Sequence, residues 1–105
     1  MHQSHDETAR QLLLLYLDEL PARVGAIHQA IRTGDEHALT LAAHTLRSTS
    51  ALVGASDLAT LCSELEAAVR KGTAASMAGW LRPLDEESSR VRAILGTRLV
   101  AEASA

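Results

Sequence analysis

At 105 residues, the chain is long enough for one compact domain and short for two. Its apolar share of 47% is ordinary, but Leu and Ala dominate, Phe is absent, and Tyr16 and Trp80 are the two large aromatic residues. This bias favours helices over strands. Thirteen acidic and ten basic residues give a formal net charge of -3, which argues against a nucleic-acid partner, because phosphate binding needs a clustered basic surface.

The apolar runs, of which Leu12 to Leu17 is among the longest, are too short to span a bilayer. The first residues, MHQSHDETAR, lack the basic and apolar regions of a signal peptide. A single cysteine, Cys62, has no partner for an internal disulfide, and this fits a reducing compartment. We therefore expect a cytoplasmic protein without membrane insertion.

The first two helices are predicted at about residues 6–17 and 20–33. Pro21 lacks an N–H and suits the first turn of a helix, so a break is expected just before it. The second segment is supported by apolar residues at helical spacing, and Gly34 ends it. These apolar residues are Leu20, Val24, Ile27 and Ile31.

A third helix is predicted at about residues 36–53, with Asp35 as its N-cap and Gly54 as its stop. A fourth is predicted at about residues 56–71, and Cys62 lies in the centre of its apolar stripe, as expected of a packing residue. The last segment, about residues 74–100, contains Pro83, where a kink or break is expected.

Short links between amphipathic helices place consecutive helices antiparallel. The sequence therefore predicts an all-α fold: an antiparallel up-down four-helix bundle with an additional short N-terminal helix. One domain is expected to cover residues 1–105.

His44 lies on the outer face of the third predicted helix. Each residue advances by roughly 100° around a helix, which gathers Leu39, Ala42, Leu46 and Val53 on the side opposite His44. Thr40, Arg47, Ser48 and Ala51 share the side of His44. The imidazole is therefore predicted to be exposed.

The neighbours of His44 suit phosphoryl chemistry. Ser48 and Ala51 are small and leave the imidazole accessible. Arg47 places a guanidinium, which suits phosphoryl oxygens, within reach of a group attached to the ring. A neutral imidazole is nucleophilic at one nitrogen when the other donates a hydrogen bond, and Glu66 on the next helix is a candidate acceptor.

Three stretches together resemble the histidine-containing phosphotransfer (HPt) domain of two-component phosphorelays. The family motif is close to H-x-L-[KR]-[GS]-[SAT]-[SA] followed by a glycine turn, and residues 44–50 read HTLRSTS, with Gly54 at the turn. The resemblance covers nearly the whole chain. Its stretches are LDELPARVGAIHQAI, TGDEHALTLAAHTLRSTSALVGA and DLATLCSELEAAVRKG.

The resemblance implies a role for each matching position. His44 is the implied phosphoryl acceptor, and Arg47 takes the basic position beside the phosphoryl group. Glu66 falls where the family has a Gln or Glu that orients the imidazole. Ser48 takes the small-residue position, often glycine, that lets a receiver domain approach, and Arg70 falls at a second basic position. Thr40, Leu41 and Ala51 complete the expected docking surface.

The implied function is that of a phosphorelay intermediate. His44 accepts a phosphoryl group from the phosphoaspartate of one receiver domain and passes it to an aspartate of another. The implied partners are receiver domains of response regulators or of a hybrid sensor kinase, and the chain is expected to be a monomer. No cofactor is expected on this chain, since Mg²⁺ comes from the receiver. The chain is either free-standing or the C-terminal part of a membrane-anchored hybrid kinase.

Two related readings of the motif remain. In the dimerisation and phosphotransfer helices of sensor kinases, an acid follows the histidine and a proline comes soon after, whereas here Thr45 follows and the next proline is Pro83. The phosphotransfer module of a chemotaxis-type kinase shares this fold and motif, so it stays open.

A metal-binding protein and a non-catalytic docking module are two unrelated alternatives. His37 and His44 share a face but lie roughly 10.5 Å apart along the axis, too far for two ligands of one metal. His2, His5 and His28 form no compact ligand set with them, so no metal site is expected.

A non-catalytic docking module would use Leu41 and Leu52 as an apolar rim. Packing beneath the first helix is the commoner fate of such residues.

Overall fold

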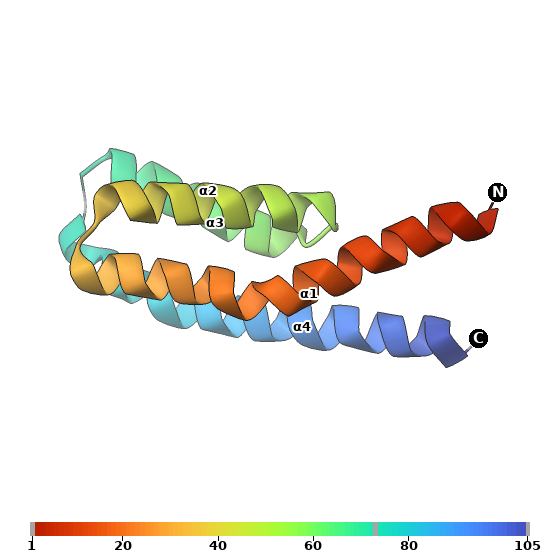
Figure 1. The fold of residues 1–105 in the computed structure, drawn as a ribbon. Helices are drawn as coiled ribbons and strands as arrows, with labels where there is room; N and C mark the ends of the chain where they lie inside the picture. Colours follow the sequence, from red (N-terminus) through yellow and green to blue (C-terminus); the bar gives the residue numbers. More distant parts are fainter. Residues whose placement is uncertain (1, 73, 105) are drawn as a thin grey trace.

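The computed structural model describes the backbone of residues 2–72 and 74–104, and the side chains of residues 7–72 and 77–101. In this part of the chain every element is helical. Helices α2 and α3 lie side by side as one layer, and α1 and α4 form the other (Figure 1). The predicted all-α bundle is confirmed. The elements are α1 (His2–Thr33), α2 (Glu36–Leu52), α3 (Ser56–Arg70), the 3₁₀ helix η1 (Ala74–Trp80) and α4 (Leu81–Ser104).

The expected break before Pro21 is wrong, because α1 runs without interruption through this residue. The predicted short N-terminal helix is therefore the first half of α1, which changes direction in its middle (Figure 1). A proline inside a helix costs about 3 kcal/mol, since it removes one hydrogen bond and crowds the preceding turn. Tyr16, Leu20 and Ile27 are buried on both sides of Pro21, and their packing against the other helices offsets this cost.

The predicted last segment is divided into two elements. Residues Ala74–Trp80 form a 3₁₀ helix, and α4 starts at Leu81, two residues before Pro83. Pro83 therefore lies in the first turn of α4, where backbone N–H groups have no partner within the helix and a proline costs little. The break falls before the proline because the proline is accommodated at the start of the new helix.

Helix α2 has the two ends that the sequence predicts. The Asp35 carboxylate accepts a hydrogen bond of 3.0 Å from the Ala38 N–H, which satisfies one of the free donors of the first turn. At the other end, Gly54 has a φ of +80°, a conformation that side chains with a Cβ rarely adopt. The Ala55 N–H donates to the Ser50 carbonyl at 2.8 Å and closes the turn into α3.

The core lies between the two layers and is dominated by aliphatic residues. Leu46, Leu58 and Ile27 are fully buried. Cys62 is also fully buried and belongs to this cluster, so the prediction that it is a packing residue is confirmed. Burial and the nearby Glu66 carboxylate raise the pKa of the Cys62 thiol to about 12, which keeps the thiol protonated at neutral pH.

Helices α1 and α4, with 32 and 24 residues, extend beyond α2 and α3 (Figure 1). A transmembrane helix needs about 20 consecutive, mainly apolar residues. Within the described ranges, no helix joins that length to the apolar character that a membrane crossing requires.

A buried hydrogen bond that the sequence does not predict joins α1 to α2. The Tyr16 hydroxyl and Ser50 Oγ are 2.8 Å apart, and Ser50 is fully buried. Burial raises the pKa of Tyr16, so the phenol remains a neutral hydrogen-bonding group at physiological pH.

Replacing Tyr16 by Phe is expected to lower the free energy of unfolding by about 1–3 kcal/mol, because it leaves the buried Ser50 hydroxyl without this partner. Urea unfolding followed by circular dichroism measures the loss. The double variant Tyr16→Phe/Ser50→Ala should recover part of the stability. Equal stability of Tyr16→Phe and wild type would show that the bond contributes nothing.

Candidate phosphotransfer site

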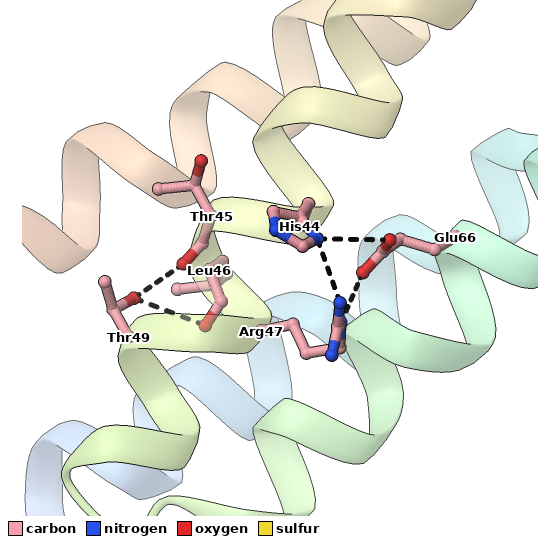
Figure 2. A network of polar contacts seen from close by, with 6 residues as sticks. All are labelled: His44, Thr45, Leu46, Arg47, Thr49 and Glu66. Carbon is pink, nitrogen blue, oxygen red and sulfur yellow. Dashed lines mark hydrogen bonds and ion pairs between the residues drawn. The ribbon is translucent and has the colours of Figure 1, made fainter.

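The candidate site lies where α2 and α3 run side by side. His44 and Arg47 come from α2 and Glu66 comes from α3 (Figure 2). His44 follows the fully buried Ala43, and its own side chain is 58% exposed. The prediction that helical periodicity turns the imidazole outward is confirmed.

Three polar contacts connect these side chains (Figure 2). Arg47 Nε donates to Glu66 Oε1 at 2.6 Å, and Arg47 Nη2 lies 2.9 Å from His44 Nδ1. Glu66 Oε2 lies 3.6 Å from the same ring nitrogen. Both charged side chains therefore approach Nδ1, whereas the opposite side of the ring, which carries Nε2, faces away from them (Figure 2).

The burial of Glu66 makes its pairing with Arg47 important. The Glu66 side chain is only 8% exposed, although it lies beside the exposed His44. A buried carboxylate needs a paired charge or hydrogen bonds, because removing the partner leaves an uncompensated charge away from water. The Arg47 guanidinium supplies this partner through Nε, and the Arg47 side chain as a whole is 38% exposed.

The expected docking positions surround His44 on α2, with one further residue on α3. Ser48 and Ala51 are exposed, as their small size and position on the helix predict. The Thr40 side chain is half-buried, and its hydroxyl donates to the Glu36 carbonyl at 2.9 Å. Arg70 is exposed in the last turn of α3. Among the described residues, the polar side chains seen to approach the imidazole are those of Arg47 and Glu66.

Leu41 and Leu52 are exposed by 59% and 66%, so the expectation that they pack beneath the first helix is wrong. They lie on the outer side of α2, where the neighbouring α1 does not cover them. Two leucines on the helix that carries His44 therefore remain free for contact with another molecule.

Other candidate chemistry gains no support from the geometry. Among the described residues, no three His, Cys, Asp or Glu side chains are grouped closely enough to hold a metal ion. The side chains of His2 and His5 lie outside the residues described. His28 instead contacts Asp85 of α4, with 2.6 Å between His28 Nε2 and Asp85 Oδ1.

Comparisons with known proteins agree with this fold. The model of the Hpt domain family matches residues 11–95. The crystal structure of histidine-containing phosphotransfer protein B from Pseudomonas aeruginosa superposes with a TM-score of 0.86 at 25% identity, over 94% of this chain and 86% of that one. The HPT domain of a sensor hybrid histidine kinase from Shewanella shares the fold, with a TM-score of 0.76, 23% identity and coverage of 95% and 86%. A search of curated protein sequences gives no match.

The chain belongs to the Hpt domain family, because the family model covers most of its length. Hpt domains carry out histidine phosphotransfer in phosphorelays and work with receiver domains. The resemblance inferred from the sequence is thus confirmed at the level of family, fold and general function.

Sequence reasoning missed the direct contact between Arg47 and the imidazole. It placed Arg47 beside the future phosphoryl group and gave the contact with the ring to Glu66. In the structure Arg47 occupies the hydrogen-bonding position at Nδ1 and also holds Glu66. The spacing of three residues between His44 and Arg47 was the available signal, since such residues are neighbours on a helix surface.

Proposed function

We propose that His44 is the phosphoryl acceptor and that Nε2 is the nitrogen that forms the bond. The observation that supports this proposal is the asymmetry of the ring. Nδ1 faces Arg47 and Glu66, whereas no hydrogen bond to Nε2 occurs among the described residues. The test is whether a phosphorylated receiver domain transfers radiolabel to the wild-type protein and not to the variant His44→Gln.

The proposed reaction is a reversible transfer between an aspartyl phosphate and the imidazole. The Nε2 lone pair forms a bond to phosphorus while the bond between phosphorus and the aspartyl oxygen breaks, and the leaving electron pair returns to the aspartate carboxylate. The transition state of phosphoryl transfer is loose, so positioning and charge stabilisation account for most of the rate. The reverse step delivers the group to an aspartate of a second receiver.

Each neighbour of His44 has a part in this proposal. Arg47 neutralises charge on the phosphoryl oxygens through its exposed end, which guanidinium geometry suits. Glu66 accepts a hydrogen bond from Nδ1–H and stabilises the positive charge that the ring acquires. Mg²⁺ is supplied by the receiver, and this chain contributes no ligand to it.

The docking surface is proposed to consist of Ser48, Ala51, Thr40, Leu41 and Arg70. The two small residues let the receiver approach the ring, and the exposed Leu41 adds apolar contact area. Arg70 adds positive charge at the edge of the same pair of helices.

Replacing Ser48 by Phe should slow transfer from a receiver at least ~10-fold, because a displacement of the reacting atoms by about 1 Å costs that much or more. The reaction of His44 with phosphoramidate, a small phosphodonor, should not change, since it needs no docking. Both rates are measured by stopping the reactions at successive times and quantifying phosphorylated His44. The matched control is Ala93→Phe on the exposed side of α4. Equal receiver rates for Ser48→Phe and wild type would remove Ser48 from the docking surface.

We also propose that the domain works as a cytoplasmic monomer, either free-standing or as part of a hybrid kinase. The free, buried Cys62 supports a reducing compartment. Sedimentation of the purified chain tests the oligomeric state.

A further inference from the structure

The contact between Arg47 and His44 fixes the position of the ring proton. A guanidinium group carries only donors and cannot accept a hydrogen bond. At 2.9 Å from Arg47 Nη2, Nδ1 of a neutral imidazole must therefore be the acceptor. The single ring proton then resides on Nε2.

This tautomer is not the reactive one. In a neutral imidazole, the nitrogen that carries the proton has no free lone pair and is not nucleophilic, whereas the other nitrogen is. In the structure the lone pair belongs to Nδ1, where Arg47 covers it. The exposed Nε2 carries the proton. The unphosphorylated site is thus arranged so that neither nitrogen is ready to attack.

We propose that Arg47 is a gate that keeps His44 in the unreactive tautomer until a phosphoryl group arrives. The incoming phosphoryl oxygens attract the guanidinium and draw Nη2 away from Nδ1. Nε2 then loses its proton to water, Nδ1 gains one from water, and Glu66 Oε2, already 3.6 Å away, accepts the new Nδ1–H. The ring is now nucleophilic at Nε2, and the protons balance.

The ion pair with Glu66 makes this motion small. Arg47 Nε is bound to Glu66 Oε1 at 2.6 Å, and the burial of Glu66 opposes any complete separation of the pair. The guanidinium can therefore keep its anchor at Nε while its partly exposed end turns toward the phosphoryl group. One arginine thereby links the arrival of the donor to the activation of the nucleophile. The link to transfer rests on the proposed function, whereas the tautomer of the free protein does not.

The first test is the tautomer of His44, determined from ¹⁵N chemical shifts at a pH where the ring is neutral. The wild-type protein should show the proton on Nε2. Arg47→Met cannot donate and should show it on Nδ1, directed at Glu66. The control Arg82→Met, an exposed arginine of α4, should match wild type. A proton on Nδ1 in the wild-type protein would overturn the gate, whether or not His44 is phosphorylated.

The second test uses an uncharged electrophile, diethyl pyrocarbonate, with His44 followed by peptide mass spectrometry. Arg47→Met should react about 5-fold faster than wild type, the factor that corresponds to one hydrogen bond of about 1 kcal/mol. Transfer from a phosphorylated receiver should instead fall about 100-fold, because charge stabilisation is lost. A faster reaction with diethyl pyrocarbonate together with slower transfer from the receiver supports the gate. An unchanged or slower reaction with diethyl pyrocarbonate overturns it.

Arg47→Met leaves the buried Glu66 carboxylate without its cation, which destabilises this variant. The double variant Arg47→Met/Glu66→Gln removes that unpaired charge and keeps an amide oxygen that can accept from Nδ1–H. It should show the same shift of the proton to Nδ1. Persistence of the proton on Nε2 in the double variant would also overturn the gate.

Discussion

Replacing His44 by Gln should abolish phosphoryl transfer to this protein. Glutamine is similar in size to histidine but carries no nitrogen with a nucleophilic lone pair, so no phosphoramidate can form. Because His44 is 58% exposed, the free energy of unfolding should change by no more than about 0.5 kcal/mol. Incubation with a radiolabelled, phosphorylated receiver measures the effect. Wild type should gain an acid-labile, alkali-stable label, and the variant should gain none.

The matched control is His37→Gln. His37 is exposed on the same helix, seven positions before His44, so the substitution makes the same chemical change on the same face. This variant should take up label like wild type. Retention of an acid-labile label in His44→Gln would show that another residue is the acceptor.

The second large effect is expected in the core beneath the site. Leu46 is fully buried, and Leu46→Ala should lower the free energy of unfolding by about 2–5 kcal/mol through lost burial and a residual cavity. This is a large part of the roughly 5–15 kcal/mol that stabilises a typical domain. Urea unfolding monitored by circular dichroism gives the difference.

Leu41→Ala makes the same substitution on the same helix at an exposed position. Its free energy of unfolding should lie within about 0.5 kcal/mol of wild type, because the Leu41 side chain is mostly exposed in the folded protein and its removal costs little buried apolar contact. Similar losses for Leu46→Ala and Leu41→Ala would mean that α2 does not face the core as the structure indicates.

The outward face of His44 was predictable because it is a local property of one helix. Asp35 and Gly54 mark the ends of α2 in the sequence, and the apolar period then assigns Leu46 to the core and His44 to the surface. No knowledge of the neighbouring helices is needed for that assignment. The same local signals gave the ends of α3 and the burial of Cys62.

The continuity of α1 was not predictable from the same kind of signal. Pro21 is a local signal for a helix break, and the local energy of the chain favours one there. The helix continues because Tyr16 and Leu20 on one side and Ile27 on the other are buried in one core. That contribution depends on residues far away in the sequence. The bond between Tyr16 and Ser50, 34 positions apart, is a similar case.

The sequence by itself determined the helical class and the exposure of His44, because composition, caps and periodicity act within single helices. The family resemblance came from the HTLRSTS motif and the stretches around it. The tertiary structure decided which side chains contact the imidazole. Glu66 lies 19 positions beyond Arg47, and the rotation of α3 against α2 sets whether its carboxylate reaches the ring, the guanidinium or neither. The partner of Nδ1, and with it the tautomer of the acceptor, follows from that packing.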